Sequence, residues 1–362
     1  MAARRLRRWE TRSQLRFSAD PQNMTTALLI SKKLAADFSA DITRILGAAP
    51  RKLDVLEFTR DMQITPVEHA SIEATFYSRD IWEGTIKTRL SDAAIAYWHI
   101  VDAAPNLKWL QVVSAGADQK PYQPSIKRGI RVTTSSGANA GPVGLTAVTG
   151  LMMLARGFPH WMRAQQKREW APQLGANSPL DMPGQTALIV GVGHIGKVIA
   201  RCLQAVGMRV IGLRRSVAPE QYFDEVKSVS ELDSLLPQCD WLILTCPLTP
   251  QTRGLIDERR LRLLPKTAGF VNMSRGEVVD EAALTRVLAG GHLRGAYLDV
   301  FTTEPLAPES PLWAMPNVII TPHNSSTGTG NYERGVQIFL RNLEAYVNRV
   351  RPLENEVTAP TA

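Results

Sequence analysis

Short apolar runs alternate with longer helical segments along the chain from Thr25 onward. The runs at 27–30, 53–58, 74–78, 107–113 and 129–133 are rich in Leu, Ile, Val and Phe and predict buried strands. The segment 35–46, which is followed by Gly47, predicts a helix. Because strands that alternate with helices form parallel sheets with crossover helices, this part of the chain predicts one α/β domain.

A second alternation begins at Thr186. Its strands are predicted at 186–190, 208–213, 241–245, 269–272, 296–299 and 318–321. Asp280 stands where it can cap a helix over 281–288, which Gly290 and Gly291 end. The last helix, 332–350, has nothing left to cover on the second sheet, so we expect it to return to the first domain. We therefore expect an α/β protein with two doubly wound parallel-sheet domains: a discontinuous flavodoxin-like domain over 24–135 and 323–352, and a Rossmann domain over 136–322.

The strand 186–190 runs directly into a glycine-rich turn with the sequence Gly-Val-Gly-His-Ile-Gly, and an amphipathic helix follows. In this context Gly191 permits the turn, Gly193 lets the backbone approach a pyrophosphate, and Gly196 lets the helix pack on the strand. The helix N-terminus stabilises the phosphate charge. The alternative is a plain structural turn. The dinucleotide interpretation assigns cofactor contacts to Gly191, Gly193, His194, Ile195 and Gly196.

The end of the next strand bears on which dinucleotide is bound. An NAD site usually has an acidic residue there, which accepts hydrogen bonds from the ribose hydroxyls. This chain has Arg214, Arg215 and Ser216 instead. Two guanidinium groups and a hydroxyl suit a 2′-phosphate, so we expect NADPH to be preferred, with NAD possible. The alternative is a pair of solvated surface arginines.

Three further side chains follow strands of the second domain, at the edge where parallel sheets bind ligands. Arg275, Glu304 and His323 suit the reduction of a carbonyl group. His323 is the expected proton donor, and Glu304 is expected to orient its ring and stabilise the imidazolium. Arg275 is expected to bind a carboxylate beside the carbonyl. Taken singly, each residue is as well explained by a surface charge, a turn or a helix cap.

Composition and charge argue against a membrane-spanning, nucleic-acid-binding or metal-binding protein. The chain has 362 residues, a net charge of +8 and no apolar run long enough to span a membrane. The tail 1–23 carries six arginines against two acidic residues, so half of the net charge lies there and no nucleic-acid partner is expected. The three cysteines lack metal-ligand spacing, no metal site is expected, and we expect free thiols in a cytoplasmic protein. The tail itself is interpreted as a disordered arm, a transit-like peptide or a result of start-site choice, with Met24 as the start.

The segment 142–170 contains a largely apolar helix followed by Phe158, Trp161 and Met162. Such a helix is buried, either in a core or in a contact between subunits. We expect it to contribute to a homodimer.

Several stretches resemble the D-isomer-specific 2-hydroxyacid dehydrogenases, from about Thr25 to Tyr346. They are 246–252 (Cys-Pro-Leu-Thr-Pro-Gln-Thr), 274–280 (Ser-Arg-Gly-Glu-Val-Val-Asp), 298–301 with Glu304-Pro305, and Thr321-Pro322-His323. Residues 304–313 and the arginines after the second strand most resemble the NADPH-preferring glyoxylate/hydroxypyruvate reductase branch of this family. It implies that Arg275 binds substrate, that Glu304 and His323 form the acid–base pair, and that Asp299 lies near the nicotinamide carboxamide. It also implies cofactor contacts from Cys246, Pro247, Met273 and Ser274, and a substrate-carboxylate loop at 114–117 that includes Ala115 and Gly116.

These observations predict NADPH-dependent reduction of a small 2-oxo acid, such as glyoxylate or hydroxypyruvate, to the D-2-hydroxy acid. One alternative is a formate- or phosphonate-type dehydrogenase on the same scaffold. Another is a dinucleotide-sensing, corepressor-like binding protein without catalysis. The chain departs from the family pattern at 143–146 and at Asn324 and Ser325, which follow the histidine, so the identity of the substrate stays open.

Overall fold

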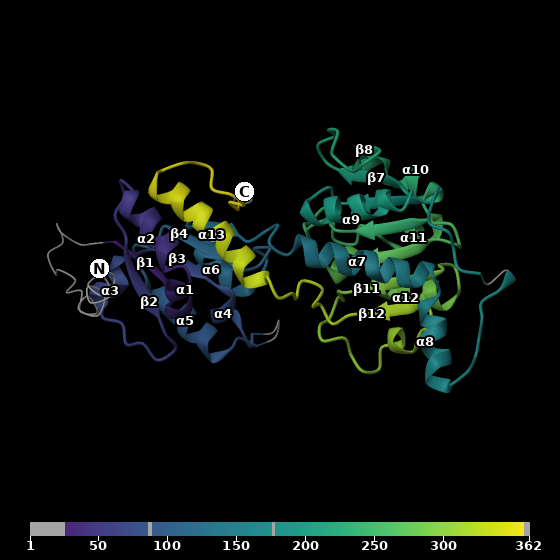
Figure 1. Ribbon diagram of the computed structural model, residues 1–362, viewed down its shortest axis with the longest axis horizontal. Helices are drawn as coiled ribbons and strands as arrows, with labels where there is room; N and C mark the ends of the chain where they lie inside the picture. Colours follow the sequence, from purple (N-terminus) through teal and green to yellow (C-terminus); the bar gives the residue numbers. More distant parts are fainter. Residues whose placement is uncertain (1–25, 86–88, 176–177, 358–362) are drawn as a thin grey trace, which may run out of the picture. The chain divides into compact units, whose positions relative to one another are not determined.

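The computed structural model describes residues 26–85, 89–175 and 178–357, so the expectations for the tail 1–23 lie outside the described residues. The chain divides into two compact units (Figure 1). Unit 1 contains 1–138 and 330–362, and unit 2 contains 139–329. The chain returns from unit 2 to unit 1 between residues 329 and 330, seven residues after the expected boundary at 322/323. His323 therefore belongs to unit 2.

Unit 1 is built on a five-stranded parallel sheet with the order β2-β1-β3-β4-β5. This order is that of flavodoxin-like sheets, as expected from the sequence. The strands begin and end close to the predicted runs because the runs are apolar, and the inner strands β1, β3 and β4 are buried along their whole length. They are β1 (Ala27–Ser31), β2 (Asp54–Phe58), β3 (Ile72–Tyr77), β4 (Trp109–Val112) and β5 (Arg131–Thr134).

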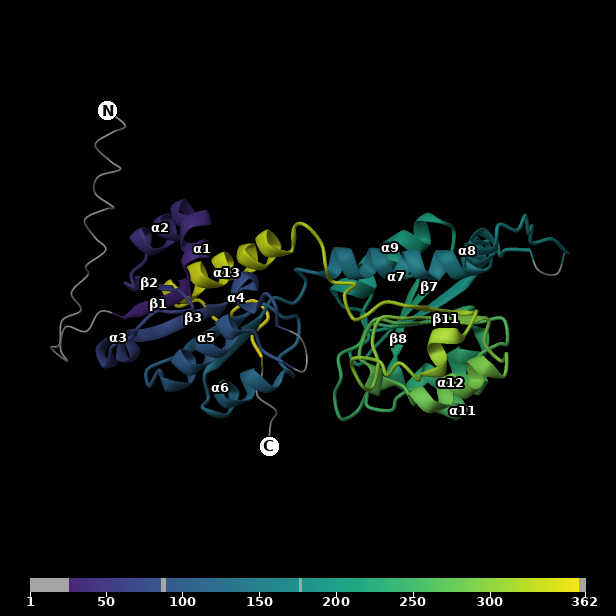
Figure 2. The same ribbon diagram turned by 90° about the horizontal axis from the view of Figure 1, so that it is seen from below.

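Helices cover both faces of this sheet (Figure 2). Leu28, Ile30 and Phe76 face α1 (Lys32–Asp37), α2 (Ser39–Ala48) and α13 (Asn331–Val347). Leu29, Tyr77 and Leu110 face the other layer, which contains α5 (Asp92–Ala103). The return of the last helix to the first unit is therefore confirmed. The short helices of the unit are α3 (Pro66–Ser71), α4 (Arg79–Trp82) and α6 (Gln123–Lys127).

The prediction of one helix over 35–46 was wrong. The chain forms α1 and α2 with a break at Phe38, whose backbone leaves the helical region at φ −119° and ψ 25°. Ser31 caps α1, because its side chain accepts a hydrogen bond from the N–H of Leu34. The Phe38 ring packs at 5.9 Å from the ring of Tyr332 on α13, a contact that local sequence does not reveal.

Unit 2 contains a seven-stranded parallel sheet with the order β12-β11-β10-β9-β6-β7-β8, which is a Rossmann arrangement extended by one strand. The prediction of a parallel Rossmann sheet is confirmed. The edge strand β8 was missed because its sequence, Glu-Val-Lys-Ser, has one apolar residue and is only partly buried. The strands are β6 (Thr186–Val190), β7 (Arg209–Arg214), β8 (Glu225–Ser228), β9 (Trp241–Leu244), β10 (Gly269–Asn272), β11 (Gly295–Leu298) and β12 (Val318–Ile320).

Two helical layers enclose this second sheet as well (Figure 2). One contains α7 (Ala140–Ala155) and α9 (His194–Ala205), and the other contains α11 (Glu258–Leu263) and α12 (Glu281–Ala289). Asp280 caps α12 as predicted, since its side chain accepts from the N–H of Ala283 at 2.9 Å. The remaining helices are α8 (Phe158–Lys167) and α10 (Leu232–Leu235). No helix among the described residues is long and apolar enough to cross a membrane.

Candidate active site

The glycine-rich turn lies between β6 and α9, where the sequence predicted it. Gly191 has φ 117°, and a Cβ atom there would lie 2.7 Å from the backbone N of Cys246. A Cβ atom on Gly196 would lie 2.2 Å from the carbonyl oxygen of Gly191. Both positions therefore require glycine, because any side chain would displace backbone atoms.

The N-terminus of α9 has room for an anion. Gly193 is the N-cap residue, no side chain caps the helix, and a Cβ atom on Gly193 would have no heavy atom within 4 Å. The N–H groups of His194, Ile195 and Gly196 thus begin a helix with open space beside its cap, which fits the pyrophosphate of a dinucleotide. The open helix N-terminus beside the glycine turn is the structural feature that fits a nicotinamide dinucleotide.

Thr245 and Cys246 follow β9 and form the wall opposite Gly191. The Thr245 hydroxyl donates to the carbonyl of Gly191 at 2.8 Å, which fixes the turn against the next strand. Cys246 is buried, and burial raises the pKa of its thiol to about 11. The wall that continues to Pro247 is therefore uncharged at neutral pH.

Arg214 is the last residue of β7 and is only partly solvated. One Nη donates to the carbonyl of Ala218 at 2.8 Å, and the other lies 3.4 Å from Oε2 of Glu220. The Nε atom is buried and has no hydrogen-bond partner among the described residues. A buried donor without a partner is the kind of group that a phosphate oxygen satisfies. Arg215 and Ser216, which come next, are exposed.

Glu220 is an acidic neighbour that the sequence reasoning missed. Its Oε2 lies 3.0 Å from Nζ of Lys197 on α9 and also faces Arg214. The hydrogen bond from Lys197, with added attraction from Arg214, holds the pKa of this carboxyl below its usual range. Glu220 lies six positions after Arg214, and the turn after β7 brings the two side chains together.

His323 and Glu304 form a close pair at the carboxyl edge of the sheet. Nδ1 of His323 lies 2.8 Å from Oε2 of Glu304, while Oε1 of Glu304 accepts from the N–H of Phe301 at 3.0 Å. The carboxylate can only accept, so Nδ1 carries the hydrogen and Nε2 is the second ring nitrogen. The Glu304 side chain is 10% exposed and that of His323 is 40% exposed, so the acid is fixed while the imidazole reaches solvent.

Asp299 has a structural role that the sequence did not reveal. Its buried carboxylate accepts from the Thr321 hydroxyl at 2.6 Å and from the N–H groups of Asn324 and Ser325, each at 3.2 Å. The Ser325 hydroxyl donates to the second carboxylate oxygen. Of the two residues after the histidine that depart from the family pattern, Ser325 anchors the turn that carries His323 through its hydroxyl as well as its N–H, and Asn324 does so through its N–H. That turn holds His323 at φ 50°, in the left-handed region.

Arg275 follows β10, at the same sheet edge as the glycine turn and His323, because β6, β10 and β12 are parallel strands of one sheet. The loop before it is fixed by Asn272, which donates to the carbonyl of Arg275 at 3.1 Å and accepts from Ser274. Met273 and Ser274 are buried. One Nη of Arg275 donates to the carbonyl of Ser274 at 2.8 Å.

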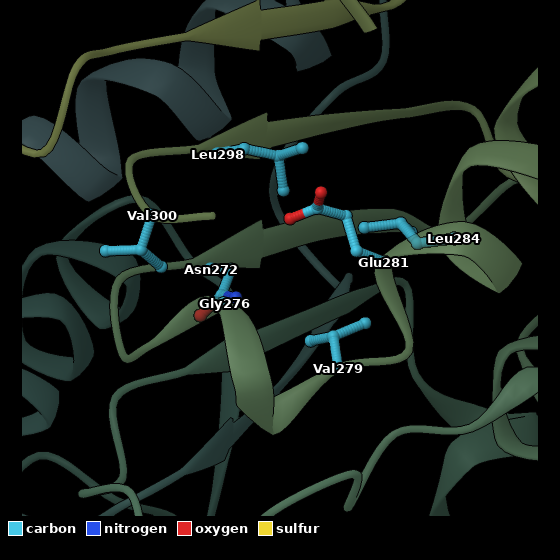
Figure 3. Close-up of a pocket in the computed structure, with 7 residues that line it drawn as sticks. All are labelled: Asn272, Gly276, Val279, Glu281, Leu284, Leu298 and Val300. Carbon is cyan, nitrogen blue, oxygen red and sulfur yellow. The ribbon is translucent and has the colours of Figure 1, made fainter. Parts of the chain in front are cut away.

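The loops of Arg275 and Glu304 are in direct contact. A Cβ atom on Gly276 would lie 1.9 Å from the carbonyl carbon of Phe301 and 2.1 Å from the N of Thr302. Glu281, on α12, accepts from that same Thr302 N–H at 2.7 Å. Figure 3 shows the small pocket at this contact, with the Glu281 carboxylate turned toward Leu298. Sequence reasoning found neither Gly276 nor Glu281 as a site residue.

Ala115 and Gly116 lie in unit 1, in the loop after β4. The Ser114 hydroxyl donates to the carbonyl of Gly116 at 2.6 Å and to the Tyr122 hydroxyl at 3.2 Å. These bonds hold a tight turn at the carboxyl edge of the first sheet. Ala115 is exposed there and Gly116 is partly exposed.

Comparison with known proteins identifies the family. Residues 148–325 match the model of the D-isomer specific 2-hydroxyacid dehydrogenase NAD-binding domain. The chain is 33% identical to a glyoxylate reductase of Thermococcus kodakarensis over 294 residues, 78% of this chain and 88% of that protein. It is 35% identical to a glyoxylate reductase of Thermococcus onnurineus over 254 residues, 69% of this chain and 76% of that protein.

Solved structures that resemble this chain include members of the same family. A D-isomer specific 2-hydroxyacid dehydrogenase from Xanthobacter autotrophicus Py2, in complex with NADPH and MES, is similar with a TM-score of 0.69 and 27% identity, over 92% of this chain and 98% of that one. An NADPH-dependent glyoxylate/hydroxypyruvate reductase from Sinorhizobium meliloti is similar with a TM-score of 0.65 and 25% identity, over 92% and 97% of the two chains. With its parallel sheets and its glycine turn, the chain belongs to the D-isomer specific 2-hydroxyacid dehydrogenases, NAD(P)-dependent oxidoreductases that act on CH–OH donors.

Proposed function

We propose that this enzyme uses NADPH to reduce glyoxylate, hydroxypyruvate or a closely related small 2-oxo acid to the D-2-hydroxy acid. The observation that carries the proposal is the 2.8 Å pair of His323 and Glu304 at the sheet edge that also bears the glycine turn. The nicotinamide cofactor supplies the hydride when it is bound. The names of the sequence relatives, which are glyoxylate reductases, support the substrate class.

In this mechanism His323 gives a proton to the substrate oxygen. Reduction of a carbonyl makes its oxygen negative, and a positioned acid lowers the barrier by supplying a proton as that charge develops. Glu304 holds Nδ1, so the ring cannot turn and Nε2 is the nitrogen from which the proton leaves. Arg275 binds the carboxylate of the substrate and stabilises the charge on the adjacent oxygen. In unit 1, the amides at Ala115 and Gly116 are the groups we propose for binding a substrate carboxylate.

The preference for NADPH rests on Arg214. Its buried Nε without a partner, together with the exposed Arg215 and Ser216, supports binding of a 2′-phosphate. Gly191, Gly193 and Gly196 with the α9 N-terminus would hold the pyrophosphate. The NADPH complex named for the Xanthobacter structure supports this choice. The test compares kcat/KM for NADPH and NADH in wild type and in Arg214→Asp, and we expect the variant to lose NADPH preference.

We further propose that the enzyme is a homodimer that associates through α8 and the segment after it. Phe158, Trp161 and Met162 on α8, with Leu174 beyond it, are exposed large apolar side chains, and Trp170 is 98% exposed. Exposed apolar side chains in one stretch of chain favour an interaction surface. Light scattering after size exclusion measures the mass directly, and a Trp161→Glu/Met162→Glu double variant should shift the enzyme to the monomer.

The decisive experiment is a turnover assay with NADPH and a panel of 2-oxo acids. Reduction of glyoxylate or hydroxypyruvate supports the proposal, with His323→Asn inactive and still able to bind NADPH. If NADPH binds and no 2-oxo acid is reduced, the corepressor-like function gains support. Oxidation of formate or phosphonate with no 2-oxo acid reduction would instead identify the other family reaction.

A further inference from the structure

Tyr297 is a buried residue of unit 2 that has no role in the proposed mechanism. It lies on β11, next to β12 (Figure 1), and it is 1% exposed. Its ring packs directly against α7, because a Cβ atom on Gly150 would lie 2.4 Å from Cδ1 of the ring. The backbone of α7 therefore fixes the ring, and with it the position of the hydroxyl group.

The hydroxyl of Tyr297 begins a chain of hydrogen bonds with a defined direction. It lies 2.8 Å from Oγ1 of Thr321, and the Thr321 hydroxyl donates to the Asp299 carboxylate at 2.6 Å. Because a hydroxyl has one hydrogen and a carboxylate only accepts, Thr321 has no hydrogen left for Tyr297. Tyr297 therefore donates to Thr321, which donates to Asp299. Burial raises the pKa of Tyr297 to about 12, so its hydroxyl keeps the hydrogen at neutral pH.

The pairing of β11 with β12 brings the three side chains of this relay together. Tyr297 and Asp299 are two residues apart along one extended segment, so their side chains point to the same face of the sheet. The parallel register pairs Leu298 with Ile320, and the N–H of Thr321 donates to the carbonyl of Leu298 at 3.0 Å. Thr321 is therefore held beside both residues, between the tyrosine hydroxyl and the carboxylate.

The relay ends at the turn that carries His323. The backbone carbonyl of Asp299 accepts from the N–H of His323 at 2.8 Å, and its carboxylate accepts from the N–H of Ser325 at 3.2 Å. His323 has φ 50°, a conformation that a residue with a side chain keeps only where the surrounding structure holds it. Asp299 thus holds the backbone at and just after the histidine, while Tyr297 and Thr321 hold Asp299. Hydrogen bonds that follow one another in this way strengthen each other.

Unit 1 contains a similar pair of hydroxyl groups that leads to no site residue. The Tyr97 hydroxyl lies 2.7 Å from Oγ1 of Thr75, which donates to the backbone carbonyl of Leu29 at 2.8 Å. By the same count of hydrogens, Tyr97 donates to Thr75. Both side chains are fully buried, so this pair stabilises the core of unit 1 and nothing else. It shows what a purely structural tyrosine–threonine pair contributes.

We propose that Tyr297 is a positioning residue for His323. Its hydroxyl acts through Thr321 and Asp299 on the turn that places the imidazole, and it does not touch the substrate. This rests on the proposed function, in which His323 is the proton donor. Loss of the tyrosine hydroxyl should therefore lower the rate of reduction more than it lowers the affinity for the cofactor.

The test uses the full chain as wild type, Tyr297→Phe and the matched control Tyr97→Phe. Each variant keeps the aromatic ring and removes one hydroxyl that donates to a threonine, and urea denaturation verifies that both are folded. With the 2-oxo acid that the wild type reduces fastest, we expect kcat to fall about 5- to 20-fold in Tyr297→Phe, the rate equivalent of one lost hydrogen bond. In Tyr97→Phe kcat should change less than about twofold. The Kd for NADPH should change less than about twofold in both variants.

Substitution of Thr321 tests the direction of the relay. Thr321→Ser keeps the hydroxyl and should keep kcat within about twofold of wild type, whereas Thr321→Val removes it and should lower kcat at least as much as Tyr297→Phe does. Because the tyrosine acts through the threonine, the double variant Tyr297→Phe/Thr321→Val should have the kcat of Thr321→Val alone. Losses that multiply in the double variant would reject the relay.

Two outcomes would overturn the proposal and leave the reductase function intact: an unchanged kcat in Tyr297→Phe, or equal losses of kcat in Tyr297→Phe and Tyr97→Phe. A wild type that reduces no 2-oxo acid would reject the proposed function instead, and NMR of the histidine rings then decides the question for Tyr297. The chain has six histidines, so His323→Asn identifies the signals of His323. Tyr297→Phe should shift the Nδ1–H signal of the ring paired with Glu304, and Tyr97→Phe should leave it in place. An unchanged signal in Tyr297→Phe would reject the positioning role.

Discussion

The N–H of Thr302 donates a 2.7 Å hydrogen bond to the carboxylate of Glu281, at the first residue of α12. The peptide that contains this N–H is also the one against which Gly276 packs. The next residues lead to Glu304, and Gly276 itself follows Arg275. A single peptide unit therefore connects the residue proposed to bind the substrate carboxylate with the residue that orients the proposed proton donor.

Substitution of Gly276 should disturb both proposed functional residues at once. A Cβ atom at this position would lie 1.9 Å from a backbone carbon of Phe301, which only a backbone shift can relieve. We expect Gly276→Ala to lose about 1–3 kcal/mol of unfolding free energy, as in other overpacked sites, and to lower kcat with glyoxylate. Urea denaturation and steady-state kinetics measure the two effects. The matched control is Gly141→Ala in α7, where a Cβ atom has no heavy atom within 4 Å and φ is not positive. Wild-type kcat in Gly276→Ala would contradict the coupling.

Substitution of Glu304 by glutamine tests the orientation of the imidazole. Glutamine keeps the size of the side chain but removes the negative charge opposite Nδ1 of His323. We expect kcat to fall about 10²- to 10³-fold, in the range typical of general acid catalysis, with little change in the Kd for NADPH. Stopped-flow hydride transfer and fluorescence titration separate the two quantities. Unchanged kcat would mean that the pair has no catalytic role.

Removal of the Glu220 charge should strengthen the binding of NADPH. Its carboxylate faces Arg214 and Lys197, and it would repel a 2′-phosphate at Arg214. We expect Glu220→Gln to lower KM for NADPH about 3- to 10-fold, through loss of a repulsion between nearby charges, and to leave KM for NADH unchanged. Glu225→Gln is the control, because Glu225 pairs with Lys227 on the same strand, β8, and with Arg209 on the adjacent β7. A higher KM for NADPH in Glu220→Gln would show that Glu220 instead holds Arg214 in its binding position.

The buried thiol of Cys239 predicts a pH dependence of stability. Burial raises the pKa of this thiol from 9.0 to about 12, so between these values the unfolded chain loses the proton and the folded chain keeps it. Stability from this group is therefore complete below pH 9 and falls as the pH rises, by about 1.4 kcal/mol per pH unit at most. Denaturation of wild type and Cys239→Ala at pH 8 and pH 10.5 measures the difference. Parallel losses in the two proteins would refute the assignment.

The sequence predicted the strands and the glycine turn because their signals are local. The run 186–190 is apolar without interruption, and Gly191 and Gly196 occupy positions where a side chain would collide with backbone. The break at Phe38 and the edge strand β8 were missed, since the first depends on a contact with the distant Tyr332 and the second on pairing with β7.

The candidate site likewise contains residues that the local sequence predicts and residues that it does not. The pairing of Glu304 with His323 could be predicted because each residue follows a strand and the two side chains have complementary chemistry. Glu220 and Glu281 could not, because their importance depends on partners that loop geometry brings to them, Arg214 in one case and Thr302 in the other.

The return of α13 to unit 1 has a consequence for biosynthesis. Phe339 stacks on Phe76 with ring centroids 4.7 Å apart, and Asn342 donates to Gln111 in the same core. The first sheet leaves the ribosome early, but the part of its face that α13 covers stays exposed until nearly the whole polypeptide has been translated. Unit 2 has all its segments once residue 329 has been translated, so it can fold before unit 1 is complete.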